Sequence, residues 1–189
     1  EEQPGLTLRQ ETVEDLLVRC HPKYPVFSLA CPELAPAIEA IVERARAAER
    51  RLGPFTPTPV HGDFHLGQVH VGDGRAWLVD FDTLGFGDPA SDLGNVTVFL
   101  KDKSRHDPTM RAMMEAFLDE YFARMEPAIR ARMPLYEALT HLRRACKQFR
   151  LQEVGWREKV EVIIERGLAS MDEMEANLAR AAHTNGRSA

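Results

Sequence analysis

The sequence predicts an α+β fold that is mainly α-helical and contains one short β-hairpin. Most of the 189 residues lie in segments whose apolar side chains recur every three or four positions, the period of a helix with one buried face. One Asp-Gly turn, at Asp73-Gly74, lies between two short apolar runs, which is typical of a hairpin. With 44% hydrophobic and 28% charged residues, the composition is that of a globular protein with its own core.

In the first third of the chain, we expect two helices joined by an irregular connector. Residues 6–20 place leucine and valine at helical spacing. Residues 21–32 contain three prolines, which predict irregular structure. Residues 36–51 have the clearest helical pattern, with apolar positions on one face and Glu and Arg on the other. Gly53 and Pro54 then end this helix.

The hairpin is expected to consist of two strands, residues 68–71 and 76–81, on either side of the Asp-Gly turn. Its open ends carry polar residues, which in chain order are His61, Asp63, Asp80 and Asp82. Because a hairpin brings its open ends together, carboxylates 17 positions apart in sequence are expected to share one site.

Helices dominate the rest of the chain. Asp88-Pro89 and Asp107-Pro108 each predict a helix start, with Asp as the N-cap and Pro at the first helical position. Two further helices are expected at residues 135–151 and 156–181, followed by a frayed tail at 184–189. The helix after Asp107 has an apolar face that is expected to belong to the core, formed by Met110, Met113, Met114, Phe117, Leu118, Tyr121, Phe122 and Met125.

Charge and cysteine content limit the function classes. The net charge of −5, without an offsetting basic stripe, argues against a nucleic-acid partner. No apolar run is long enough to cross a bilayer, so no membrane partner is expected. The three cysteines are odd in number and far apart, which favours reduced thiols and a cytoplasmic location. Residues 61–107 hold eight acids and four bases, an excess expected of a site that binds cations.

The polar residues around the hairpin have the composition of a phosphoryl-transfer site. Asp63 follows Gly62, where the backbone can turn sharply, and its carboxylate can orient a hydroxyl or accept its proton. Gln68 offers an amide oxygen and Asp80 a charged oxygen, and Mg²⁺ prefers a few such ligands together with water and phosphates. Asp82 would face the same side as Asp80 if the segment stays extended. The competing interpretation is that these acids only form turns, as Asp73 does.

Three segments carry a resemblance to a known family. They are His61-Gly62-Asp63 with Gln68 five residues later, Val79-Asp80-Phe81-Asp82, and Gly87-Asp88-Pro89-Ala90-Ser91-Asp92. Together they resemble the aminoglycoside phosphotransferase/choline kinase family, whose enzymes have a protein-kinase-like fold. The resemblance implies that this chain is a protein-kinase-like C-terminal lobe and that the hairpin carries its catalytic and metal-binding loops.

The resemblance also implies a role for each matched residue. Asp63 corresponds to the catalytic aspartate, and Asp80 to a metal-binding aspartate. Gln68 occupies the place of the usual metal-binding asparagine, as in maltokinase-like members, and its extra methylene lengthens the reach. Asp92 would brace the catalytic loop, and His61 would organise it. The implied cofactors are Mg²⁺ and ATP (or GTP), and the implied substrate is a small hydroxylated molecule such as an aminoglycoside, an amino-alcohol or a sugar.

One part of the family pattern is not found. The family's N-terminal lobe supplies a glycine-rich loop and a strand lysine, but no such pattern precedes residue 60, where Lys23 is the only lysine. We therefore expect a C-terminal lobe alone, in which residues 1–32 are a helix and connector, 33–107 the catalytic core and 108–189 a helical subdomain. This leaves two hypotheses: the catalytic lobe of a small-molecule kinase, or a non-catalytic binding module. In either, the exposed face is expected to contact an N-terminal lobe or a second copy of the chain.

Other interpretations have less support. Gly62-Asp63-Phe64-His65 resembles the start of a metallophosphatase motif, but the partner motifs are missing. A zinc site at His61, His65 and His70 lacks a thiol or another histidine cluster nearby. The basic run at residues 143–150 is expected to be a solvated helix face, with contact to phosphate or to a partner as the alternative. The acids Glu115, Asp119 and Glu120 fit either an exposed face or the lining of a cleft for a cationic substrate.

Overall fold

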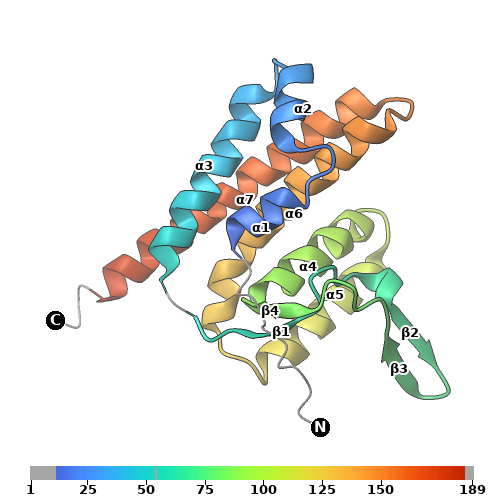
Figure 1. Ribbon diagram of the computed structural model, residues 1–189. Coiled ribbons are helices and arrows are strands. Elements are labelled where there is room, and N and C mark those ends of the chain that lie inside the picture. The colour runs from blue at the N-terminus through green and yellow to red at the C-terminus, as the bar shows by residue number, and fades with distance from the viewer. Residues whose placement is uncertain (1–11, 54, 186–189) are drawn as a thin grey trace, which may run out of the picture.

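The protein is described by a computed structural model over residues 12–53 and 55–185. It is mainly helical, with two small antiparallel sheets between the third and fourth α-helices (Figure 1). In chain order the elements are α1 (Val13–Val18), α2 (Tyr24–Ala30), α3 (Ala35–Leu52), β1 (Thr58–Val60), the 3₁₀ turn η1 (Leu66–Gln68), β2 (Val69–Gly72), β3 (Arg75–Leu78), β4 (Gly85–Gly87), α4 (Ala90–Ser104), α5 (Pro108–Phe122), α6 (Ala128–Leu151) and α7 (Trp156–Asn185). None of these helices is long and apolar enough to cross a membrane.

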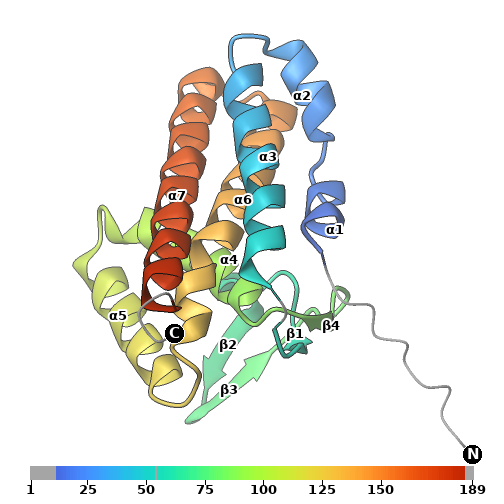
Figure 2. The ribbon, with the colours of Figure 1, turned by 90° about the vertical axis from the view of Figure 1, so that its left-hand side faces the viewer.

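Helices α3, α6 and α7 lie side by side and hold most of the core (Figure 2). On α3 the apolar side chains predicted to face inward are buried, namely Ile38, Ile41, Val42, Ala45 and Ala48. Their burial confirms the helix predicted from spacing at residues 36–51. Helix α7 begins at Trp156 as predicted and continues to Asn185. The predicted frayed tail therefore overlaps the end of α7, and residues 186–189 lie outside the described part.

The connector predicted at residues 21–32 is instead largely helical. Helix α2 has Pro25 in its first turn, where a missing N–H costs no intrahelical hydrogen bond. Phe27 anchors α2, because its ring is fully buried and stacks on Phe149 of α6 at 5.0 Å between ring centroids. Proline content alone was misleading here, since the proline falls at a position where a helix tolerates it. The helix predicted at residues 6–20 is observed as α1, and its first predicted positions lie outside the described residues.

Helix α6 begins at Ala128, seven residues before the predicted start. Pro134 lies inside it and is buried, although a proline removes one hydrogen bond from a helix interior. The surrounding side chains keep the helix continuous, because Ile129, Met133 and Leu135 are all buried in the core. Packing against the core therefore keeps α6 helical through Pro134, where a proline favours a helix boundary.

The apolar face of helix α5 is less buried than predicted. Asp107 caps it as expected, since its side chain accepts a hydrogen bond from the N–H of Thr109 at 2.8 Å. No residue of α5 is fully buried, however. Its face from Phe117 onward is partly buried against the core, whereas Met113 is 37% exposed. The prediction that all four methionines belong to the core is therefore wrong.

The hairpin of β2 and β3 projects from the end of the molecule opposite the α2 end of the bundle (Figure 1). The Asp73-Gly74 turn is as predicted, with φ of 49° and 69°. Strand β3 ends at Leu78, three residues before the predicted end, because Asp80 has a φ of 66° and turns the chain away. The second sheet, in which β1 pairs with β4, was not predicted from the sequence.

A close helix crossing connects these sheets to the bundle. A Cβ at Gly94 of α4 would lie 2.5 Å from Cβ of Tyr136 and 2.9 Å from the backbone N of Glu137 on α6. Only glycine allows the two backbones to approach so closely. The first turns of α4, which follow β4 directly, are thereby held against α6.

Candidate active site

The segment His61–Phe64 leaves strand β1 in a sharp turn that requires glycine. Gly62 has a φ of 81°, and a Cβ there would lie 2.6 Å from the carbonyl oxygen of Thr83. The turn places Asp63 at the surface, with 40% of its side chain exposed. We call residues 61–64 the catalytic loop, because they contain the predicted catalytic aspartate.

Asp92 in the first turn of α4 holds this loop by its backbone. Its carboxylate accepts hydrogen bonds from the N–H groups of His61 at 2.6 Å and Gly62 at 2.9 Å. Burial raises the pKa of Asp92, and these two bonds act in the opposite direction by favouring the charged form. The structure thus places Asp92 where the resemblance predicted a bracing residue.

Three further hydrogen bonds fix the loop from other sides. The hydroxyl of Thr83 donates to the carbonyl of His61 at 2.7 Å, and the side-chain amide of Asn95 donates to the carbonyl of Phe64 at 2.8 Å. Nε2 of His61 lies 2.9 Å from the carbonyl oxygen of Val79, the residue before Asp80. The buried imidazole of His61 therefore connects the catalytic loop to the segment that follows the hairpin.

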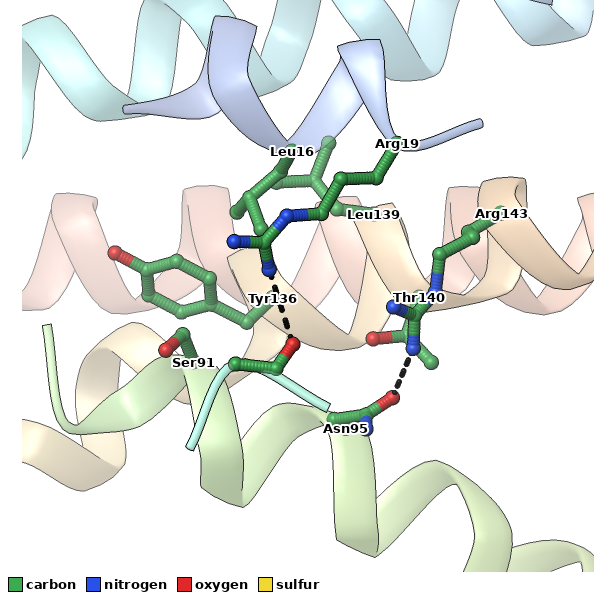
Figure 3. A pocket seen from close by; sticks show the side chains of 9 residues that line it. Leu16, Arg19, Ser91, Asn95, Tyr136, Leu139, Thr140 and Arg143 are labelled. Atoms are coloured by element: carbon green, nitrogen blue, oxygen red, sulfur yellow. Dashed lines mark hydrogen bonds between the residues drawn. The ribbon is translucent and has the colours of Figure 1, made fainter. Parts of the chain in front are cut away.

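Two arginines flank the catalytic loop from the helical side (Figure 3). Arg19, just after α1, donates to the carbonyl of Gly62 at 3.0 Å. Arg143 of α6 donates to Oδ1 of Asp63 at 2.9 Å and to the side-chain oxygen of Asn95 at 2.8 Å. Between them lies a small cavity of about 30 Å³, bounded also by Tyr136. Arg19 thus binds the backbone of the loop at Gly62, and Arg143 binds the carboxylate of Asp63.

The contacts of Arg143 correct the prediction that residues 143–150 form only a solvated face. The signal was present in the sequence, since Arg143 follows the buried Leu139 and Thr140 by four and three residues and so shares their helix face. A second correction concerns Asp88, which was predicted only to cap a helix. It accepts a hydrogen bond from the N–H of Ala90, and it is also buried in an ion pair with Arg132 at 2.7 Å.

Gln68 and Asp80 form the second part of the candidate site. Nε2 of Gln68 donates to Oδ2 of Asp80 at 2.9 Å, which brings the two predicted metal ligands together. Gln68 is buried in the 3₁₀ turn before β2, whereas Asp80 is exposed. Asp82 lies on an exposed turn, and the extended segment that would align it with Asp80 is not formed.

The residues present suit Mg²⁺ as a cation held jointly with a ligand. In the structure the amide nitrogen of Gln68 faces Asp80. Rotation of that amide by 180° would place its oxygen beside the Asp80 carboxylate, so that both supply hard oxygen ligands to one ion. Residues 12–53 and 55–185 contain no group of three or more histidines, cysteines and acids that could hold a metal alone. Phosphate oxygens and water would have to complete the coordination, as is usual for Mg²⁺.

Comparison with known proteins identifies the family. The sequence profile of the phosphotransferase enzyme family matches residues 24–136, and the chain belongs to that family. Among solved structures, a choline/ethanolamine kinase family protein from Mesorhizobium loti is 22% identical with a TM-score of 0.55, over 75% of this chain and 50% of the other. Spectinomycin phosphotransferase in complex with ADP and spectinomycin is 13% identical with a TM-score of 0.47, over 90% and 57%. The search of curated proteins gave no match.

These comparisons confirm the family predicted from the sequence motifs. The helical architecture with small antiparallel sheets agrees with a kinase-like fold, and the first structural likeness supports that fold. The chain spans about half the length of the solved structures it matches.

Proposed function

We propose that this chain is the catalytic lobe of a small-molecule kinase, which transfers the γ-phosphate of ATP or GTP to a hydroxyl group. Membership of the phosphotransferase family supports the reaction class. The observation that carries the proposal is the fixed position of Asp63, on a loop that Asp92, Thr83 and Asn95 hold by hydrogen bonds. An acceptor such as an aminoglycoside, an amino-alcohol or a sugar would present its hydroxyl to this carboxylate.

In the proposed reaction, the acceptor oxygen attacks the γ-phosphorus while the bond from that phosphorus to the β–γ bridging oxygen breaks. Asp63 orients the hydroxyl and receives its proton, and a nucleoside diphosphate leaves. Gln68 and Asp80 would hold Mg²⁺, and the ion would neutralise charge on the phosphates. The loop contributes positioning, because its hydrogen bonds set the direction of the carboxylate before the substrate binds.

A second candidate function is a binding module without turnover. Several apolar side chains around the hairpin are exposed, including Phe81 and Leu84 at 47% and 48%. Such a patch is typical of a surface that another lobe, a second copy of the chain or a partner covers. In that case the face would serve association, and Asp63 would have no catalytic role.

Calorimetric titration of the full chain with Mg·ATP and Mg·GTP tests the proposal. We expect binding that the Asp80→Asn variant loses. Asp73→Asn is a matched control, because Asp73 is also an exposed aspartate with a positive φ and lies in the turn of the adjacent hairpin. Binding that is equal in both variants, or absent from the unmodified chain, would contradict a nucleotide–metal site at Asp80 and favour the binding module.

Phosphate transfer itself is tested with Asp63→Asn. This variant keeps the size of the side chain and the hydrogen-bond acceptor for Arg143, but it removes the basic oxygen. We expect nucleotide binding to persist while nucleoside diphosphate production in the presence of acceptors falls by a factor of about 10² or more. Retained turnover would exclude Asp63 as the base.

A further inference from the structure

A second and larger pocket opens beside Asp63, on the side of the catalytic loop that faces α6. Its volume is about 230 Å³. Asp63 is the acid in its wall, and the basic residues that line it are Arg19, Arg143, Arg144, Lys147 and Arg150. The pocket therefore adjoins the carboxylate to which an acceptor hydroxyl must come.

The wall of this pocket is strongly basic, although the whole chain carries a net charge of −5. Five arginine and lysine side chains line it, against one carboxylate. Arg143, Lys147 and Arg150 follow one another at intervals of four and three residues, so a single face of α6 presents all three to the pocket. A concave site lined by one sign of charge concentrates ligands of the opposite sign.

Internal pairing neutralises only part of this charge. Arg143 pairs with Asp63, and Arg144 pairs with Asp102 of α4. Lys147 and Arg150 are exposed and make no ion pair or hydrogen bond with the described part of the chain. Two exposed cationic groups of the pocket wall are thus available to a ligand.

Arg144 is held rigidly in the same wall. Its guanidinium lies over the ring of Phe99 at 5.0 Å, and its Nη1 atom is buried without a hydrogen-bond partner in the described structure. An arginine fixed by an aromatic ring and an acid needs little reorganisation to bind an anion.

We infer that the acceptor carries an anionic group, a phosphate or a carboxylate, which this basic pocket binds while the hydroxyl lies at Asp63. The inference rests on the proposed kinase function and specifies its substrate class. Arg144, Lys147 and Arg150 bind the anion, and Arg143 stays with Asp63. A polycationic acceptor such as an aminoglycoside is disfavoured, because its ammonium groups would meet like charges at the pocket.

Four hexose derivatives test this assignment because they differ mainly in charge. D-Glucose 6-phosphate, D-glucuronate, D-glucose and D-glucosamine are titrated into the full chain by calorimetry at low salt. We expect both anions to bind at least tenfold more tightly than glucose, and glucosamine to bind more weakly than glucose. The stronger of the two anions distinguishes a phosphate site from a carboxylate site. Equal affinities, tighter binding of glucosamine, or no binding of either anion would overturn the inference.

Variants locate the binding. Lys147→Ala combined with Arg150→Ala should weaken anion binding about tenfold or more and reduce its salt dependence. Arg111→Ala is the control, since Arg111 is an exposed arginine on α5 that does not line the pocket. A double variant that binds the anions unchanged would overturn the inference. A double variant that loses affinity for Mg·nucleotide but not for the anionic hexoses would also overturn the inference, because the pocket would then bind the phosphates of the donor.

Failure of the proposed function has a different signature. If Mg·nucleotide binds and a neutral or cationic acceptor is phosphorylated in preference to the anions, the kinase proposal stands and the acceptor assignment fails. If the anions bind but Mg·nucleotide does not, the kinase proposal fails, and the acceptor assignment fails with it.

Discussion

The helical bundle and the catalytic loop are held together by different forces. In the bundle of α3, α6 and α7, large apolar side chains such as Ile41, Leu142 and Ile164 are almost fully buried. The hairpin of β2 and β3 has no buried residue, and the catalytic loop beside it is held by hydrogen bonds. Burial of apolar area is the larger and less directional term, whereas hydrogen bonds contribute less free energy but fix geometry.

The two regions meet at α4, which explains how a weakly packed loop keeps a defined shape. Asp92 and Asn95 hold the loop from one end of α4, and the close crossing at Gly94 presses the same turns against α6. Farther along, Lys101 of α4 pairs with the buried Glu137 of α6. The site therefore obtains its geometry from the bundle through a few polar contacts.

The largest effect is expected from a cavity in the bundle. Leu142→Ala removes a fully buried side chain from the centre of α6. We expect the free energy of unfolding to fall by about 2 to 5 kcal/mol. Urea denaturation followed by circular dichroism measures it. A loss below about 1 kcal/mol would mean that the core around α6 can collapse into the space.

Acid should lower the free energy of unfolding by nearly as much, through a buried histidine of the bundle. Burial, with the charge of nearby Arg144, lowers the pKa of His141 from 6.5 to about 4. Below pH 6.5 the unfolded chain gains a proton that the folded protein does not take up until about pH 4. The contribution of His141 to the free energy of unfolding is therefore fully present above about pH 6.5 and falls by about 3 kcal/mol as the pH drops to 4.

His141→Leu isolates this contribution. The variant should lose less stability than the unmodified protein between pH 7 and pH 4, as measured by urea denaturation at several pH values. His70→Gln, at an exposed position on β2, is the control that should leave the profile unchanged. Identical profiles for the unmodified protein and His141→Leu would show that other groups cause the acid sensitivity.

An intermediate effect is expected where the loop meets α4. Asp92→Ala leaves the N–H groups of His61 and Gly62 without their acceptor. We expect a loss of about 1 to 3 kcal/mol. Hydrogen exchange at these two amides should accelerate more than exchange in α7. Asp92→Asn retains one acceptor oxygen. Its free energy of unfolding and its amide exchange rates should therefore lie between those of the unmodified protein and of Asp92→Ala. Unchanged protection of both amides would contradict the bracing role.

The smallest effect is expected on the hairpin. Val71 on β2 is 77% exposed, so Val71→Ala should change the free energy of unfolding by no more than about 0.5 kcal/mol. The same urea denaturation as for Leu142→Ala provides a direct comparison of the two regions. A loss above 1 kcal/mol would show that the hairpin contributes to the folded core as the bundle does.

Sequence patterns predicted the features that depend on local chemistry. Helical spacing located α3 and α7, the Asp-Gly pair located the hairpin turn, and Asp107 located the start of α5. The motif residues also indicated the family, which the profile match confirms. Each of these signals acts within a few residues of the chain, so no knowledge of distant segments was required.

Only the tertiary structure decided the features that depend on distant partners. The pairing of β1 with β4, the helix α2 within a proline-rich segment and the continuation of α6 through Pro134 all rest on contacts between remote segments. The same is true of Arg143, which is 80 positions from Asp63 in sequence and 2.9 Å from it in space. Side-chain partners at such separations depend on how helices pack, and packing is set by burial of the whole core rather than by any local pattern.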